Sequence, residues 1–244
     1  DREATERKVV EQAAEMAEQL GMAAPGTRAI VLRHADWHPG VVGIVCSRLV
    51  ERFARPTILL CDDGTVAKGS GRSITGFNLH AGLEACAHTL TKFGGHDAAA
   101  GMAVASDRFD EFAEAFIAHA NGRLTDDDLV SHIRIDCVAD AGELTTQAIE
   151  LLDELRPFGR GNPKIRLLLK GVPVDRDAAP FGANARHLAV HVGQRPSVRC
   201  IAWNRGEECP QMKRGRLLDL VITPQVSSWS GKVEPLIEDW RPTD

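Results

Sequence analysis

The chain has 244 residues, of which 43% are hydrophobic and 26% are charged. These values are typical of a globular protein and exclude a fibrous or low-complexity chain, and the length predicts one or two domains. No apolar run approaches the roughly 18 residues of a membrane span, so neither a transmembrane helix nor a signal peptide is expected. The six cysteines contain no C-x-x-C pair, which favours reduced thiols in the cytoplasm over a zinc site.

Charge is distributed unevenly along the chain. The formal net charge is −5, yet the segment 156–216 holds 13 Lys and Arg against four acidic residues, a net of +9. A basic segment inside an acidic protein is a candidate surface for binding a polyanion such as nucleic acid. A solvated strand face with scattered arginines would have the same composition.

The first half of the chain alternates between predicted helices and strands. The Glu-rich segment 1–20 has apolar residues at a helical period and ends at Gly21, which predicts an amphipathic helix suited to connecting two parts of a longer chain. The next expected elements are a strand at 29–32, a helix from Pro39 to Phe53, a hairpin over 57–73, a helix over 79–90, and a helix over 109–120 with Ser106 as its N-cap. Such alternation predicts an α/β domain, a mixed sheet with flanking helices.

The pattern changes after the acidic run 125–128. A strand is expected over 131–138 and a linking helix at about 143–156. Five short strands follow, at 165–170, 187–192, 198–203, 217–223 and 232–240. They predict a mainly-β barrel of the OB type. The expected parts are a connector helix at 1–22, an α/β domain at 23–124 and an OB-like domain at 125–244.

Two glycine-flanked motifs are candidates for phosphate binding. In the Gly-Ser-Gly-Arg-Ser segment 69–73 the glycines let a ligand approach the backbone, the serines supply hydroxyls, and Arg72 supplies a fork that matches phosphate. An ordinary strand end with one exposed arginine is the alternative. In segment 94–101 two glycines precede His96 and small residues follow, which describes a tight loop where backbone and imidazole meet a ligand together. A structural histidine is the alternative there.

The turn Trp37-His38-Pro39-Gly40 is a third candidate, because it opens a predicted helix whose N-terminus favours anions. A capped turn with Trp37 in the core explains the same residues, so His38 ranks behind the other two motifs. No metal centre is expected. Two-metal hydrolysis needs several carboxylates and imidazoles converging on the ions, and no Asp-His-His signature occurs in the sequence.

Taken together, these segments resemble the RecJ family, the single-strand-specific DNA exonucleases of the DHH phosphoesterase superfamily. The segments that carry the resemblance, in chain order, are Trp37–Ile44, Arg55–Thr57, Gly69–Ser73, Phe77–Leu79, Phe93–Gly101 and Leu155–Pro163. The Gly-Gly-His element marks the DHH-associated domain generally, with one extra alanine here before Gly101. The Pro-Phe-Gly-Arg-Gly-Asn-Pro element at 157–163 is more particular to RecJ.

The resemblance implies roles for individual residues. Ser70 and Arg72 would bind the phosphate at the 5′ end of the strand, and His96 would assist catalysis near the scissile phosphate. Further residues expected at the substrate are Ser73, Gly94, Gly95 and His38. Residues expected to follow the DNA backbone are Arg156, Arg160, Lys164, Arg186 and Arg199. Aromatic residues make up only 5% of the chain, so the barrel is expected to rely on charge, with Phe158, Phe181, Trp203 and Trp229 as the available stacking residues.

In the family, an N-terminal DHH domain holds Mn²⁺ or Mg²⁺ and performs the hydrolysis. This sequence lacks the motifs of that domain, so the chain is expected to bind no metal or other cofactor and to be inactive alone. Its implied function is the nucleic-acid-binding C-terminal half of a cytoplasmic 5′–3′ exonuclease in DNA repair and recombination. Its expected partners are single-stranded DNA and the DHH domain, with no membrane. The alternatives are a DHH-superfamily phosphodiesterase acting on dinucleotides or oligonucleotides, and a non-catalytic module that binds single-stranded DNA.

Overall fold

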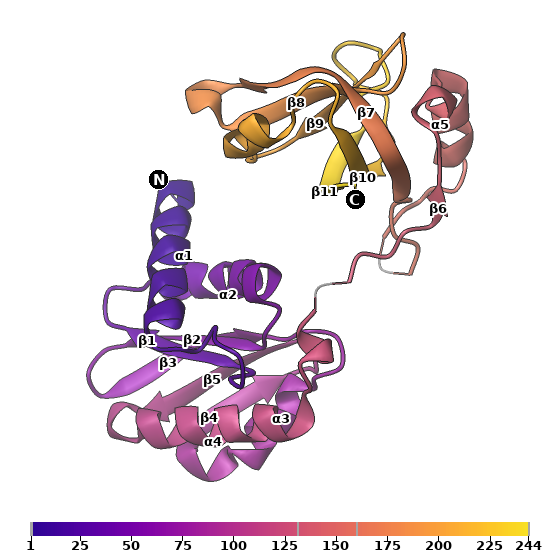
Figure 1. The fold of residues 1–244 in the computed structure, drawn as a ribbon. Coiled ribbons are helices and arrows are strands. Elements are labelled where there is room, and N and C mark those ends of the chain that lie inside the picture. The colour runs from indigo at the N-terminus through magenta and orange to yellow at the C-terminus, as the bar shows by residue number, and fades with distance from the viewer. Residues whose placement is uncertain (1, 131, 160, 244) are drawn as a thin grey trace. The chain divides into compact units, whose positions relative to one another are not determined.

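The computed structural model describes residues 2–130, 132–159 and 161–243, and the chain divides into two compact units, Asp1–His132 and Ile133–Asp244 (Figure 1). This division falls later in the chain than the expected boundary after residue 124. Each unit has hydrophobic cores of its own. Within the described ranges no helix is long and apolar enough to cross a membrane.

The first unit is a five-stranded mixed sheet in the order β1-β2-β3-β5-β4. Its strands are β1 (Ile30–His34), β2 (Thr57–Asp62), β3 (Val66–Arg72), β4 (Leu90–Gly95) and β5 (Ala99–Ala105). Its helices are α1 (Arg2–Gln19), α2 (Pro39–Phe53), α3 (Leu79–Ala85) and α4 (Phe109–Arg123). The pair β1–β2 is parallel, with α2 as the crossover, and the remaining pairs are antiparallel.

Helices lie on both sides of the sheet (Figure 1), and alternate strand residues are buried against them on each face. Ile30, Leu32 and Leu59 pack against α1 and α2 on one face. Ile58 and Leu60 point the other way, into the core formed with α3 and α4. Because side chains alternate with a period of two, every second residue of β3, β4 and β5 also belongs to the α2 face. On that face β4 and β5 present Gly94 and Gly101, both exposed.

Three local predictions for the first unit are wrong. The helix expected over 79–90 ends at Ala85, and the segment 94–101 is a β-hairpin between β4 and β5 rather than a loop. Gly and Ala are poor strand formers, so the sequence does not reveal these two strands, which form because β5 pairs with β3 and β4 pairs with β5. Ser106 is not the N-cap of α4, because its hydroxyl donates to the Asp62 carboxylate at 2.5 Å instead.

The second unit is a closed five-stranded barrel in the order β7-β8-β9-β11-β10, with β10 pairing back onto β7. Its strands are β7 (Leu167–Phe181), β8 (His187–Val192), β9 (Val198–Ala202), β10 (Leu217–Thr223) and β11 (Leu236–Pro242), with the short β6 (Cys137–Val138) beside β7. The pair β9–β11 is parallel and the other pairs within the barrel are antiparallel. This is the OB arrangement, so the predicted fold class is confirmed for both units.

The first barrel strand is longer than the sequence indicates. Gly171, at φ 60°, and Pro173 read as the end of a strand, yet β7 continues through both. The register with β10 shifts between Leu218 and Leu220, opposite this point, and the Asp219 carboxylate accepts the amide N–H of Gly171 at 2.9 Å. A bulge of this kind bends a strand and lets it pair on both edges, which closes the barrel. The helix α5 (Thr146–Asp153) precedes the barrel, and of the strand expected over 131–138 only β6 is found in the described part.

Candidate nucleic-acid interface

Ser70 and Arg72 lie on β3, on the sheet face that α2 covers. A Cβ placed on Gly43 of α2 would lie 3.2 Å from Arg72 Nη2 and 3.6 Å from Ser70 Oγ, so both side chains reach the same point on the helix. Arg72 Nη1 donates to the carbonyl of Gly71 at 2.8 Å. No carboxylate of the described residues lies within ion-pair distance of its guanidinium. A half-buried, uncompensated guanidinium beside a hydroxyl suits a phosphate.

A buried thiol holds α2 against this part of β3. The Sγ of Cys46 donates to the carbonyl of Ser70 at 3.1 Å. Burial raises the pKa of the Cys46 thiol to about 12, so the group remains a neutral donor near pH 7. This hydrogen bond ties the backbone of Ser70 to α2.

Two glycines form a bare floor beside Ser70. Ser70 pairs with Gly101 on β5, and Gly101 pairs with Gly94 on β4. A Cβ on Gly94 would meet nothing within 4 Å, and one on Gly101 only the carbonyl oxygen of Gly69 at 3.7 Å. Neither glycine has a positive φ, so neither packing nor backbone conformation requires them. Their effect is to leave the peptide backbone open to an approaching group.

Gly95 has a structural reason to be glycine. Its φ is 146°, and a Cβ there would lie 2.5 Å from the Cα of Ala100. The hairpin between β4 and β5 therefore requires this glycine whether or not a substrate binds.

A cavity of about 570 Å³ lies over the glycine floor. It is lined by Pro39, Lys68, Gly69, Ser70, Lys92, Phe93, Gly94, Gly101, Met102 and Ala103. Phe93 and Met102 pack into the core on the opposite face of the sheet, so they contribute backbone here. Sequence reasoning missed Lys68 and Lys92. Their positions could have indicated them, because Lys68 lies two residues before Ser70 and Lys92 two residues before Gly94. Residues two apart in a strand point to the same face of the sheet.

The remaining predicted residues of the first unit do not line this cavity. His96 is exposed in the β4–β5 turn, and its N–H donates to the carbonyl of Ala99 at 2.8 Å. Ala99 also pairs with Arg72 on its other side. His96 and Arg72 therefore lie on either side of Ala99, at one end of the sheet. His38 is the N-cap of α2, its Nδ1 accepting the N–H of Gly40 at 3.0 Å. The Ser73 hydroxyl donates to the carbonyl of Phe77 at 2.7 Å, and Ser73 lines a separate depression.

The outer face of β8 and β9 in the second unit carries an aromatic cluster. The His187 ring lies 5.3 Å from the Phe181 ring and 4.7 Å from the Trp203 ring, between ring centroids. Trp203 is 51% exposed. Arg199 lies over the Phe181 ring at 5.4 Å. Trp229, in the loop between β10 and β11, is 95% exposed, so it has almost no packing role within the described chain.

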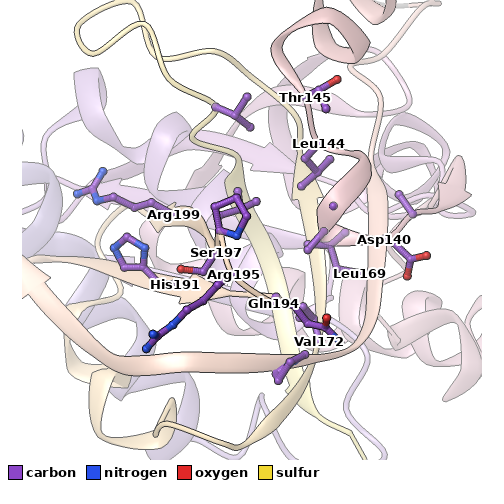
Figure 2. Close-up of a pocket in the computed structure, with 18 of the residues that line it drawn as sticks. Asp140, Leu144, Thr145, Leu169, Val172, His191, Gln194, Arg195, Ser197 and Arg199 are labelled. Atoms are coloured by element: carbon purple, nitrogen blue, oxygen red, sulfur yellow. The ribbon is translucent and has the colours of Figure 1, made fainter.

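A cavity of about 890 Å³ in the same unit carries several cationic side chains (Figure 2). Arg176, His191 and Arg199 form a row across β7, β8 and β9, since His191 pairs with both arginines. Figure 2 shows His191 and Arg199 grouped with Arg195 of the β8–β9 loop. Desolvation by burial, with a further contribution from Arg176 and Arg199, lowers the pKa of His191, so its ring is neutral near pH 7.

Most arginines of this cavity already have an acidic partner. Arg199 pairs with Glu234, and Arg195 pairs with Asp175 at 3.4 Å. The basic character of this segment is therefore partly neutralised within the fold.

The residues predicted to follow the DNA backbone divide between two places in the second unit. Arg199 lies on the outer face of β9, and Arg186 is exposed immediately before His187. Arg156 and Lys164 line a different cavity of about 480 Å³, where Arg156 pairs with Asp153 at 3.1 Å. Arg160 lies outside the described residues.

The described residues do not provide a donor set for a divalent metal. Across residues 2–130, 132–159 and 161–243 no group of three or more His, Cys, Asp and Glu side chains is arranged to hold an ion. Catalytic Mg²⁺ and Mn²⁺ sites need several oxygen or imidazole ligands, so these residues do not fit such a site.

Comparison with known proteins identifies both units. A family model of the DHHA1 domain matches residues 26–122, and a model of the RecJ OB domain matches residues 135–238. The chain belongs to the RecJ family. This confirms the resemblance found in the sequence.

The relatives are longer proteins than this chain. The single-stranded-DNA-specific exonuclease RecJ of Bacillus subtilis is 35% identical over 231 residues, which cover 93% of this chain and 29% of the relative. RecJ of Thermus thermophilus is 33% identical over 221 residues, covering 87% of this chain and 29% of that protein. The crystal structure of Thermus thermophilus RecJ in complex with Mg²⁺ matches all of this chain and 36% of its own, at a TM-score of 0.75 and 30% identity. The chain thus spans about a third of the length of the RecJ proteins it matches.

Proposed function

We propose that this chain is the nucleic-acid-binding C-terminal part of a RecJ-type 5′–3′ exonuclease acting in DNA repair and recombination. In this proposal the DHHA1 unit binds the 5′ phosphate of a single strand, and the OB unit holds the strand. The observation that carries the proposal is the uncompensated guanidinium of Arg72 beside Ser70 and the glycine floor. The RecJ relatives, whose names specify single-stranded DNA, support the choice of substrate.

The phosphate site would combine two kinds of contact. The guanidinium of Arg72 offers planar paired donors, and the Ser70 hydroxyl adds one more. The exposed backbone at Gly94 and Gly101 allows the sugar-phosphate chain to approach without meeting a side chain. Hydrogen bonds between charged groups are about twice as strong as neutral ones, so Arg72 would contribute the larger part.

The strand site would combine stacking with charge. OB domains bind oligonucleotides on the face of their second and third strands, here β8 and β9, and through the adjoining loops. That face presents Trp203 and His187, and the β10–β11 loop presents Trp229. Since Arg195 and Arg199 already pair with carboxylates, we propose that stacking contributes more than the low aromatic content indicates.

Hydrolysis would depend on residues outside this chain. We propose that Mn²⁺ or Mg²⁺ is held by a DHH domain of the intact protein and that His96 assists there. The described residues offer no metal site, so no catalytic step is derived from them. The protein is then expected to act in the cytoplasm, and the purified chain is expected to bind single strands without degrading them.

The test is whether Arg72 makes binding depend on a 5′ phosphate. Oligonucleotides of one sequence, with either a 5′ phosphate or a 5′ hydroxyl and a 3′ fluorophore, are titrated with the chain and anisotropy is read. The parent should prefer the phosphate by about tenfold, the value of one charge-assisted contact. Arg72→Ala should abolish the preference, while Arg123→Ala, at the end of α4 on the opposite face, should retain it.

Two results would contradict the proposal. One is an unchanged phosphate preference in Arg72→Ala. The other is a dinucleotide competing as well as a long strand, which would favour the small-substrate phosphodiesterase.

A further inference from the structure

Two lysines share the cavity of Ser70, and the proposed binding of a terminal phosphate does not use them. Lys68 on β3 and Lys92 on β4 both pair with Ala103 of β5, so their side chains leave the sheet on the same face, on either side of one small residue. Both lysines are exposed and both line the cavity. Within the described ranges neither ammonium group has a hydrogen bond or an ion pair.

The charge of Lys68 acts on a carboxylate, that of Asp63. This carboxylate accepts the backbone N–H groups of Val66 and Thr65 at 2.8 and 2.9 Å. These bonds lower the pKa of Asp63, and the charge of Lys68 adds to the effect. The carboxylate is thus committed to the hairpin turn, and Lys68 remains available to a ligand.

The strand register arranges the site in three parallel rows. The first contains Arg72, Ala99 and His96, the second contains Ser70, Gly101 and Gly94, and the third contains Lys68, Ala103 and Lys92. Successive rows are two residues apart along each strand, which is a distance of about 7 Å. The lysine row therefore lies on the far side of Ser70 from His96.

We propose that Lys68 and Lys92 bind a phosphoryl group attached to the terminal phosphate, so that the site accepts 5′-di- and 5′-triphosphorylated strands. This inference rests on the proposed function. If the terminal phosphate lies at Ser70 and Arg72 and the scissile bond lies toward His96, the nucleic acid extends toward His96. On the opposite side of the terminal phosphate, toward the lysines, the groups that can extend a 5′ end are further phosphates.

The chemistry of the third row fits this ligand. Each ammonium group is a point charge with three donors and can follow a flexible polyphosphate. The floor between the lysines is the small side chain of Ala103. A volume of about 570 Å³ exceeds what a single phosphate needs and falls within the range of small-molecule sites.

The experiment compares binding of three oligonucleotides that differ only at the 5′ end, which carries a hydroxyl, a monophosphate or a triphosphate. Titrations use the 244-residue chain at one fixed ionic strength, because added charge alone strengthens binding at low salt. The variant is Lys68→Ala/Lys92→Ala. The matched control is Arg7→Ala/Lys8→Ala, which removes two exposed positive charges from α1.

The parent and the control should bind the triphosphorylated strand about tenfold or more tightly than the monophosphorylated one. The lysine variant should lose that difference and bind the monophosphorylated strand within about twofold of the parent. Two results would overturn the inference. The parent could show no preference for the triphosphate, or the lysine variant could weaken both strands equally, which would make the lysines contacts of an internal phosphodiester.

The inference and the proposed function fail in different ways. Loss of the monophosphate-over-hydroxyl preference in Arg72→Ala supports the terminal phosphate site whatever the lysines do. A retained preference in Arg72→Ala would remove that site, and with it the basis for placing a second phosphate beside it.

Discussion

Replacing Gly101 with alanine separates the requirements of folding from those of binding. A Cβ at this position has as its nearest neighbour the carbonyl oxygen of Gly69 at 3.7 Å, an ordinary van der Waals distance. Its φ is not positive, so alanine fits the strand without strain. Alanine is favoured over glycine within a strand by about 0.5–1 kcal/mol. The free energy of unfolding should therefore stay the same or rise by up to that amount.

The same methyl group should weaken binding. It would project from the floor of the cavity, beside Ser70, and hold a phosphate away from the Ser70 hydroxyl and from the open backbone. Loss of one contact to a charged group is worth about 1.5–3 kcal/mol, so the dissociation constant for a 5′-phosphorylated strand should rise about tenfold or more.

Gly69→Ala is the contrasting variant. A Cβ there would lie 1.9 Å from the carbonyl oxygen of Leu59, so β2 and β3 must move apart. Overpacking of this kind costs about 1–3 kcal/mol, and more where the obstacle is backbone.

The assays are urea unfolding for stability and fluorescence anisotropy for binding. The reasoning is refuted if Gly101→Ala lowers the free energy of unfolding, or if it binds the phosphorylated strand as tightly as the parent does.

Two further predictions concern the OB unit. Trp229→Ala should leave the urea midpoint unchanged, because the side chain is 95% exposed, and should weaken binding of an oligothymidine by about 1–3 kcal/mol; unchanged affinity by anisotropy would exclude Trp229 as a stacking residue. Burial lowers the pKa of His191 in the folded state, so the unfolded chain binds more protons. The His191 contribution to stability is therefore lost as pH falls from about 6.5 through the lowered pKa of the folded state. Unfolding measured from pH 7.5 to 5.5 should show a smaller loss of stability in His191→Gln than in the parent, and equal losses would contradict the assignment.

The sequence predicts best those elements whose periodicity and end signals agree. The helix α2 is an example, since Pro39 stands at its first position and its apolar residues recur at a helical period. The five barrel strands were also predicted, because turn residues separate apolar runs. These signals are local, so a single chain segment is enough to read them.

The sequence predicts least where order comes from distant pairing. The strands β4 and β5 consist largely of Gly and Ala near their hairpin. They are ordered by pairing, because β5 pairs with β3 and β4 pairs with β5. In β7 a glycine and a proline suggest a break where the fold uses a bulge.

For the candidate site too, local motifs predict some residues, whereas others are found only through the pairing of distant strands. Ser70 and Gly94 were identified from motifs and do line one cavity, with Arg72 beside it. Ser73 belongs to the same motif, yet its hydroxyl bonds within its own turn. Lys68 and Lys92 lie far apart in the sequence outside any recognised motif, and only the strand register brings them together.

The most direct test of the account follows the backbone amides of the ¹⁵N-labelled chain by NMR during titration with a 5′-phosphorylated single strand. The account predicts that the amides of Gly94 and Gly101 and the side-chain Nε of Arg72 shift, and that these shifts are lost with a 5′-hydroxyl strand of the same sequence. Shifts confined to the OB unit, or identical for the two strands, would contradict the claim that this glycine floor receives a nucleic-acid phosphate.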